Sequence, residues 1–414
     1  MIPKAEILEA ARETGLLATT VEKDYVLGWV LAAIAEHVEV SEWVFKGGTC
    51  LKKCYFDTYR FSEDLDFTIP DGVQYDQGTI TESLAAVAAQ VHDRTGIEFP
   101  LDGLDVRESV NKRGKLTFGA RMTFSGPLQL PRAERQRIRF DLTRDELVVE
   151  PPEKRDVFHG YSDAPAPSAR VRCYSLNEVL AEKLRALVER SGRARDVYAV
   201  VNVGRNLHRD LSAEEIVAIA TEKFRFKDLD DPTSEQIIQA VDPTILEIDW
   251  GHALRHQLPV LPPVDEFFAA LTEVLDWLFA VEAAPLPLPA VPARSGEVEV
   301  PPVRFARPAP AAGLGRGAPA PSRAWPAETF GSRMDRIRYG ARNRLLVRID
   351  YHGVPRLVEP YSLRVPRTGN LLLYVHEVQR AGGPGGGIKA FKVAEIGRVE
   401  ITAQPFQPRY LIEL

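Results

Sequence analysis

The chain has 414 residues, of which 45% are hydrophobic and 27% are charged. These proportions are ordinary for a globular protein, and the length allows more than one domain with a sizeable core. No run of 18 apolar residues and no signal-peptide layout is present, so we expect a cytoplasmic protein without a membrane partner. Three cysteines are too few for a disulfide framework and are expected to be small buried thiols.

The net charge of −6 is unevenly distributed along the chain. Residues 1–280 hold 33 basic and 47 acidic side chains, a net charge of −14, whereas residues 331–414 hold 14 and 7, a net charge of +7. This asymmetry indicates two modules with different partners. An acidic N-terminal half does not favour binding of RNA by charge alone, so a divalent metal and a local basic patch would have to compensate.

The first predicted elements are a helix and a strand. Thr19 and Glu22 have the spacing of a capping box and predict a helix of about 15 residues. Its apolar stripe would consist of Val26, Leu27, Val30, Leu31 and Ile34. A short strand at 43–46 then runs into a tight turn at Gly47 and Gly48 that opens another helix.

The Gly-Gly turn is a candidate phosphate site. Backbone N–H groups of Gly47 and Gly48 can approach a triphosphate at a helix start, and Thr49 can donate its hydroxyl or cap the helix. Taken alone, two glycines serve a purely structural turn equally well. Ser62, further along, can contact a phosphate or cap the strand that follows, and Arg60 can bind phosphate or simply be exposed.

Two aspartates at i and i+2 are the strongest candidates for chemistry. Asp64 and Asp66 lie on a predicted strand at 64–69 and therefore point to the same face. Neighbouring carboxylates repel unless a cation lies between them, and oxygen ligands suit Mg²⁺. Strands are also predicted at 115–125 and 136–143. Asp141, on the last of these, can complete the metal site or accept a proton from an attacking hydroxyl, or it can simply close an edge strand.

The pattern then becomes helical, with helix starts predicted at Ser175, Ser212, Thr233 and Val264. Lys183 lies three residues after Leu180 and four before Leu187, inside the apolar stripe of its helix. A lysine in that position either extends its amine to solvent or points into a site. On periodicity alone, the first alternative is favoured.

Several of these segments together resemble the AbiEii/AbiGii toxin family of the nucleotidyltransferase superfamily. The similar runs are FKGGTCL (45–51) and RFSEDLDF (60–67), with VEKDY (21–25), AEKL (181–184) and RDVY (195–198) around them. The resemblance covers roughly residues 15–280 and implies an α+β fold in which a mixed sheet with helices is followed by a helical portion. It also implies that Lys183 holds the triphosphate and that Asp196 orients Lys183 or the acceptor.

As the resemblance implies, the catalytic residues would be Asp64, Asp66, Asp141, Lys183 and Asp196. Mg²⁺, or Mn²⁺, would be held by the first three of these and an NTP would be the substrate. The acceptor would be RNA such as the 3′ end of tRNA, and a cognate antitoxin would be a partner. The alternatives are transfer to a protein or a small molecule, which the −14 charge favours, and a non-catalytic ligand sensor.

The remaining chain divides into a linker and a second domain. We expect domain boundaries at 1–282, a Pro/Ala-rich linker at 283–330, and a β-rich domain at 331–414. Strands are predicted at 345–351, 357–360, 371–378, 388–393 and 398–401, with the Gly-rich run 382–387 as a flexible hairpin loop. The segments RLLVRIDY (344–351) and VEPYSL (358–363) resemble the WYL domain, although a full Trp-Tyr-Leu signature is absent.

The resemblance to the WYL domain implies a small SH3-like β-barrel that senses a ligand. Basic and aromatic side chains on its predicted strands would suit a nucleotide or an oligonucleotide. These side chains are Arg344, Arg348, Arg356, Arg364, Tyr351 and Tyr361. A basic barrel whose side chains are merely solvated explains the same pattern equally well.

Overall fold

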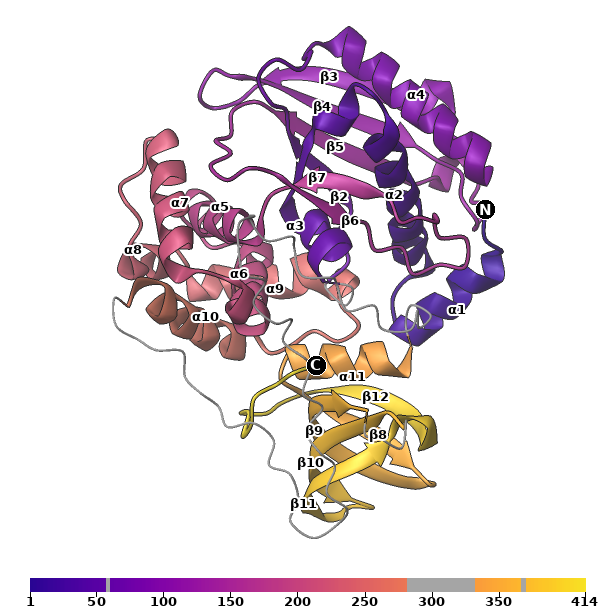
Figure 1. The fold of residues 1–414 in the computed structure, drawn as a ribbon, viewed down its shortest axis with the longest axis vertical. Coiled ribbons are helices and arrows are strands. Elements are labelled where there is room, and N and C mark those ends of the chain that lie inside the picture. Colours follow the sequence, from indigo (N-terminus) through magenta and orange to yellow (C-terminus); the bar gives the residue numbers. More distant parts are fainter. Residues whose placement is uncertain (57–59, 281–331, 366–369) are drawn as a thin grey trace, which may run out of the picture. The chain divides into compact units, whose positions relative to one another are not determined.

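The computed structural model describes residues 1–56, 60–280, 332–365 and 370–414 (Figure 1). The predicted linker at 283–330 lies outside the described residues. The chain divides into two compact units, Met1–Pro285 and Leu286–Leu414, and each unit contains its own sheet.

The first unit is built on a mixed seven-stranded sheet with the order β3-β4-β5-β2-β1-β7-β6. Its strands are β1 (Val44–Lys46), β2 (Asp64–Thr68), β3 (Leu104–Val110), β4 (Leu116–Thr123), β5 (Arg137–Thr143), β6 (Glu153–Asp156) and β7 (Arg170–Cys173). The pairs β2/β5 and β1/β7 are parallel and the other pairs are antiparallel. The four predicted strands are confirmed as β1, β2, β4 and β5. Strand β6 was not predicted, because its sequence, Glu-Lys-Arg-Asp, has no apolar alternation.

Three long helices belong to the N-terminal part: α1 (Lys4–Thr14), α2 (Ala18–Glu36) and α4 (Gln77–Thr95). Helix α2 packs against α1, α4 and β7 and is buried from Thr20 to Ile34, so its predicted apolar stripe is only part of its buried surface. The predicted capping box is wrong, because the N-cap is Leu17 and no side chain caps it. The Glu22 carboxylate instead accepts hydrogen bonds from Leu128 N at 2.7 Å and Gln136 Nε2 at 2.9 Å.

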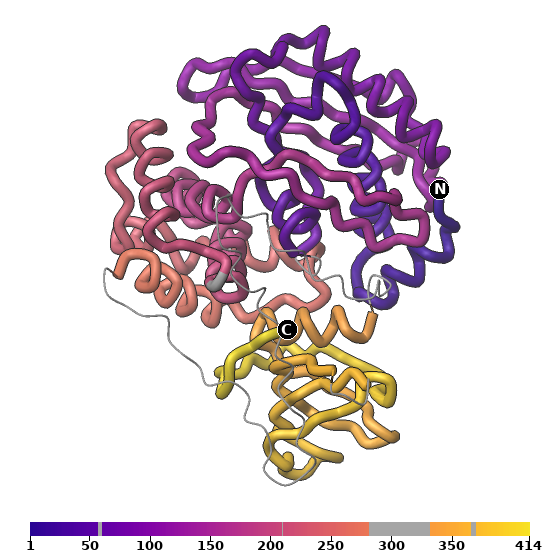
Figure 2. The backbone as a smooth tube through the Cα atoms, viewed as in Figure 1, coloured from indigo at the N-terminus to yellow at the C-terminus, as the bar shows by residue number. Residues whose placement is uncertain are grey.

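A group of helices follows the sheet in sequence and lies beside it in space (Figures 1 and 2). Its members are α5 (Leu176–Glu189), α6 (Ala194–Leu207), α7 (Ala213–Phe226), α8 (Ser234–Gln239), α9 (Pro243–Leu254) and α10 (Val264–Phe279). The Ser175, Ser212 and Thr233 side chains cap α5, α7 and α8 as predicted. Tyr198 stacks on Phe267 in the core of this group, at 5.2 Å between ring centroids.

Short helical segments complete the first unit. The Gly-Gly turn opens the single-turn helix α3 (Gly47–Cys50), which continues as a π-helical turn, η2 (Leu51–Tyr55). Single-turn 3₁₀ helices lie at Val40–Glu42, Leu101–Gly103, Arg132–Glu134, His208–Asp210 and Arg255–Gln257. In the described parts of the chain, no helix has both the length and the apolar character needed to cross a membrane.

The second unit is an antiparallel sheet with the order β11-β10-β9-β8-β12, against which one helix packs. Its elements are α11 (Arg333–Arg342), β8 (Leu345–Tyr351), β9 (Val354–Arg364), β10 (Leu372–Arg380), β11 (Gly383–Lys392), the 3₁₀ turn Val393–Glu395, and β12 (Ile396–Pro405). Its core includes Met334 and Ile337 of α11 together with Val347, Val358 and Leu373 of the sheet.

Two predictions for this unit, the Gly-rich loop and the closed barrel, are not confirmed by the structure. The Gly-rich run is not a loop, because residues 383–387 open β11, and a Cβ at Gly385 would lie 1.9 Å from the carbonyl oxygen of Glu377. Glycine is therefore needed for the close approach of two backbones. The strand pairs of the described residues leave β11 and β12 at the two ends of the sheet, so closure into the predicted SH3-like barrel is not confirmed.

Candidate active site

The register of three central strands gathers the predicted carboxylates. Asp66 on β2 is the Cα partner of Asp141 on the parallel strand β5. On its other side, Asp66 is the partner of Lys46 on the antiparallel strand β1. Asp64 lies two residues earlier on β2, and all three aspartates line one cavity of about 670 Å³. The sheet thus places Lys46, Asp66 and Asp141 in one row across three strands, and Asp64 lies two residues from that row on β2.

The cavity also brings together most of the other predicted residues. Those that line it are Gly47, Gly48, Arg60, Ser62, Lys183, Arg193, Arg195 and Asp196. Thr49 is different, because it is fully buried and is absent from the cavity wall. Its hydroxyl donates to the Asp64 carbonyl oxygen at 2.5 Å, so Thr49 holds the Gly-Gly turn against β2.

Glycine at positions 47 and 48 is required by close contacts with the site. Gly47 has φ of +79°, and a Cβ there would lie 2.2 Å from Asp66 Oδ2. A Cβ at Gly48 would lie 2.5 Å from a terminal guanidinium nitrogen of Arg60 and 3.2 Å from Ser62 Oγ. The missing side chains therefore let a carboxylate, a guanidinium and a hydroxyl group approach the same turn.

Asp66 is held in an environment that disfavours its charge. Burial raises the pKa of Asp66 to about 6, and the neighbouring carboxylates of Asp141 and Asp64 add to this effect. The Lys46 ammonium acts in the opposite direction but does not cancel it. A cation bound at this point would remove the repulsion among the three carboxylates.

Opposite the aspartates, α5 and α6 contribute an ion pair. Lys183 Nζ lies 2.7 Å from Asp196 Oδ1, with side-chain exposures of 11% and 3%. Burial would raise the pKa of Asp196, but the charges of Lys183 and Arg190, together with the Lys183 hydrogen bond, lower it. Lys183 therefore points into the site rather than extending to solvent, which answers the alternative that the sequence left open.

Arginines extend this wall into a basic surface. Arg190 lies 4.0 Å from Asp196, Arg193 lies 3.6 Å from Asp249, and both line the cavity. Burial and the neighbouring Arg60 charge lower the pKa of Arg195. Arginines gathered in one cavity suit the oxygens of phosphate groups.

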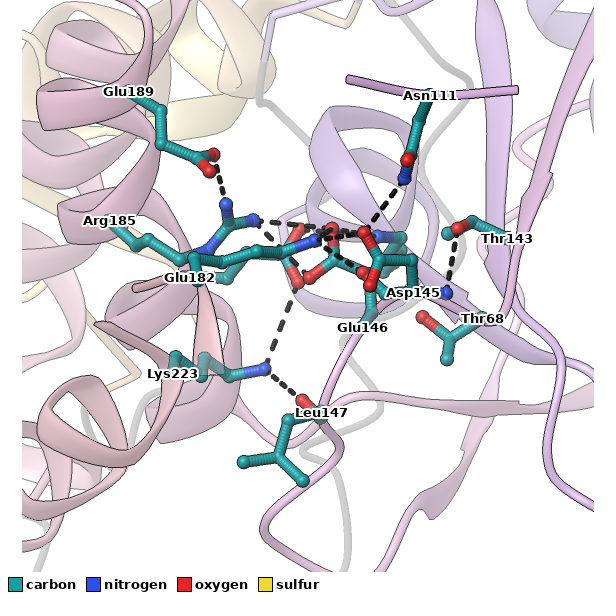
Figure 3. Close-up of polar contacts among 12 residues, drawn as sticks. Thr68, Asn111, Thr143, Asp145, Glu146, Leu147, Glu182, Arg185, Glu189 and Lys223 are labelled. Atoms are coloured by element: carbon teal, nitrogen blue, oxygen red, sulfur yellow. Dashed lines mark hydrogen bonds and ion pairs between the residues drawn. The ribbon is translucent and has the colours of Figure 1, made fainter. Parts of the chain in front are cut away.

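A buried network of charged groups that the sequence did not reveal supports the site (Figure 3). Lys46 Nζ lies 3.6 Å from both Glu146 and Glu182, and the Arg185 guanidinium lies 3.3 Å from Glu146. Burial opposes ionisation of Glu182, but the nearby cations, Lys46 first, lower its pKa to about 2. The network therefore ties β1, next to the Gly-Gly turn, to the helix that carries Lys183.

The same network fixes the segment that follows β5. Lys223 Nζ lies 2.5 Å from Glu178 and donates to the Leu147 carbonyl oxygen at 2.6 Å. Asn111 donates to Asp145 Oδ2 at 2.7 Å. From the sequence alone, these charged residues would be expected to lie on the solvent-exposed surface. The available signal was Glu182 beside Lys183, since two adjacent charges on the buried side of a helix need partners.

Comparison with known proteins identifies the family to which this chain belongs. MenT4, a nucleotidyltransferase toxin from Mycobacterium tuberculosis H37Rv, shares 19% sequence identity and a TM-score of 0.48 with this chain, covering 68% of this chain and 91% of MenT4. No curated protein sequence matches. The sequence model described as nucleotidyl transferase AbiEii toxin, type IV toxin–antitoxin system, matches residues 29–277. The chain therefore belongs to the AbiEii family and is a nucleotidyltransferase toxin of a type IV toxin–antitoxin system.

Proposed function

We propose that this enzyme transfers a nucleotidyl group from an NTP to the 3′ end of tRNA in a reaction that depends on Mg²⁺. The observation that carries the proposal is the single cavity in which Asp64, Asp66 and Asp141 face Lys183 and a basic wall. Carboxylates that bind a metal and cations that bind phosphates are the two groups that nucleotidyl transfer requires.

The donor set fits a divalent metal. The three carboxylates on β2 and β5 supply only oxygen ligands, and burial, together with the charges of Asp141 and Asp64, raises the pKa of Asp66. Asp64, Asp66 and Asp141 would hold Mg²⁺ or Mn²⁺, which when bound offsets negative charge on the reacting phosphates.

The protein's own groups then have distinct roles in the proposed reaction. Lys183, held in place by Asp196, and the nearby arginines bind the triphosphate. The Gly-Gly turn and Ser62 support its phosphates from the side of β1. The acceptor hydroxyl gives its proton to Asp141, its oxygen bonds to the α-phosphorus, and the bond to pyrophosphate breaks.

The charge of the first unit bears on the choice of acceptor, and family membership bears on the partners. The arginines of the cavity wall can bind an RNA backbone, although the −14 charge of residues 1–280 favours a protein or small molecule as the alternative acceptor. Membership of a toxin family also implies a cognate antitoxin.

For the C-terminal unit we propose a WYL-like role in binding a nucleotide or oligonucleotide. Its +7 charge, from residues 331–414, supports that role. Arg356 is unsuited to it as a surface contact, because it is buried and pairs with Glu377. Arg348 pairs with Glu400 at 3.5 Å and is exposed, so it can exchange this partner for a phosphate.

The test is incubation of the purified protein with each α-labelled NTP, Mg²⁺ and total tRNA, with Asp66→Ala as the control. We expect label on RNA with the wild type only, and this result would also identify the nucleotide. Label on the protein itself would replace the tRNA proposal by protein modification. Binding of NTP without transfer of label to tRNA, other RNA pools or protein would refute the catalytic proposal in favour of a sensor.

A further inference from the structure

All three cysteines of the chain lie close together, between the helical segment that follows the Gly-Gly turn and β7. Cys50 and Cys54 lie one turn apart on α3 and η2, and Cys173 lies on β7. Their sulfur atoms all lie within 4.8 Å of one another, and no residue of the three is more than 2% exposed. The sequence shows only the first two as neighbours, because the third arrives through the pairing of Phe45 with Cys173 in the β1/β7 ladder.

The spacing of the sulfur atoms suits a common metal ligand set. A metal–thiolate bond of about 2.3 Å places ligand sulfurs roughly 3.8–4.0 Å apart. The three sulfurs need to move by less than about 1 Å to reach that spacing. A disulfide would use two of these thiols and leave the third unexplained, whereas a metal ion uses all three.

A guanidinium group and a hydroxyl group lie beside the cysteines. The Arg155 guanidinium lies over the Tyr55 ring at 4.3 Å, and Arg155 Nε donates to the Cys54 carbonyl oxygen at 3.2 Å. The Tyr55 hydroxyl lies 3.9 Å from Cys173 Sγ, so one oxygen donor stands beside the sulfurs.

We propose that Cys50, Cys54 and Cys173 bind one thiophilic metal ion, Zn²⁺ or Cu⁺, in a structural site. Three sulfurs alone complete a site for Cu⁺, and the Tyr55 hydroxyl would add the fourth ligand for Zn²⁺. Binding releases the thiol protons to solvent and involves no oxidation. Because the site is buried, the ion enters as the chain folds, and it ties the helix after the Gly-Gly turn to β7.

The test measures metal directly in the full-length protein. We expect about one equivalent of Zn or Cu per chain by elemental analysis after expression in medium that contains the corresponding ion. Cys173→Ala should contain at least about tenfold less metal. Val171→Ala is the matched control, because it removes a buried side chain from the same strand without removing a thiol.

Two further variants separate the possible explanations. Tyr55→Phe should lower the Zn content and leave the Cu content unchanged, which distinguishes the two ions. Asp66→Asn should keep the metal, because Asp66 supplies no ligand to the thiol site.

If Cys173→Ala does not fold, wild type produced with Co²⁺ decides the question, because a thiolate-to-Co²⁺ absorption band is expected in the near ultraviolet. Wild type without that band, or with no more metal than Cys173→Ala, would overturn the proposal.

Discussion

Replacing Asp66 by asparagine should make the metal-free protein more stable while abolishing nucleotidyl transfer. Asparagine keeps the shape of the side chain but removes a charge that burial and two neighbouring carboxylates disfavour. Lys46 keeps Glu146 and Glu182 as partners, and Lys183 keeps Asp196, so the substitution leaves neither cation unpaired. This combination of a gain in stability and a loss of activity is a known feature of functional sites.

The magnitude follows from the pKa of Asp66, which rises from 3.8 to about 6 on folding. Below about pH 4, the folded and unfolded chains both hold the proton, and folding bears no cost from this group. As the pH rises above about 6, the folded protein bears the full cost of an ionised Asp66, up to about 3 kcal/mol. Water in the cavity reduces this cost, so we expect Asp66→Asn to gain about 1–3 kcal/mol at pH 7.5 and almost nothing near pH 4.

The assay is urea unfolding of both proteins, without added metal, at pH 7.5 and near pH 4. Tryptophan fluorescence reports on the relevant unit, because four of the five tryptophans, all but Trp325, lie within residues 1–280. The exposed Asp71→Asn serves as the control and should change stability at neither pH. Addition of Mg²⁺ should stabilise the wild type and not Asp66→Asn. A loss of stability in Asp66→Asn at pH 7.5, or an equal gain at both pH values, would refute the reasoning.

Three other predictions concern the same cavity. Gly47→Ala should destabilise the protein by about 1–2 kcal/mol, because its φ is positive. It should also abolish stabilisation by Mg²⁺, because its Cβ would displace Asp66; melting curves that match those of the wild type, both with and without Mg²⁺, would contradict this. Lys183→Met should cost about 3 kcal/mol, because it removes the partner at 2.7 Å and leaves the buried Asp196 only the more distant Arg190 at 4.0 Å, and Asp196→Asn in the same chain should recover most of that loss in a double-mutant cycle. Arg193→Ala should weaken RNA binding and reduce the slope of log affinity against log salt concentration by about one; an unchanged slope in a titration series would exclude contact with the RNA backbone.

The sequence predicted those features of the site that depend on local periodicity. Alternation along one strand placed Asp64 and Asp66 on the same face, and both line the cavity. A charge inside an apolar stripe marked Lys183 as a candidate, and its pairing with Asp196 shows which alternative applies. Asp196 itself came only from the family resemblance, because an aspartate in the first turn of a helix is common without any function.

The features that the sequence did not predict depend on long-range pairing. Asp141 was predicted as a candidate for the metal site, but its position beside Asp66, 75 residues earlier in the chain, depends on the parallel pairing of β2 with β5, which no local pattern contains. Strand β7, which carries Cys173, is only four residues long and was not predicted. The ion network around Lys46 was missed for a different reason, since its charged members resemble a solvated helix face until their partners are known.

The short segment from β1 through η2 joins these observations, because its side chains act on opposite sides of the same backbone. Lys46 and Gly47 face the carboxylate side, where Gly47 leaves room for Asp66. Thr49 fastens the turn to β2 through its hydroxyl, and Cys50 faces Cys173 on β7. A metal ion at the thiols would therefore restrain the turn on the side of β7, opposite the side on which Asp66 contacts Gly47. Loss of that ion should loosen the Gly-Gly turn and weaken Mg²⁺ binding, although no residue of the thiol site touches the cavity.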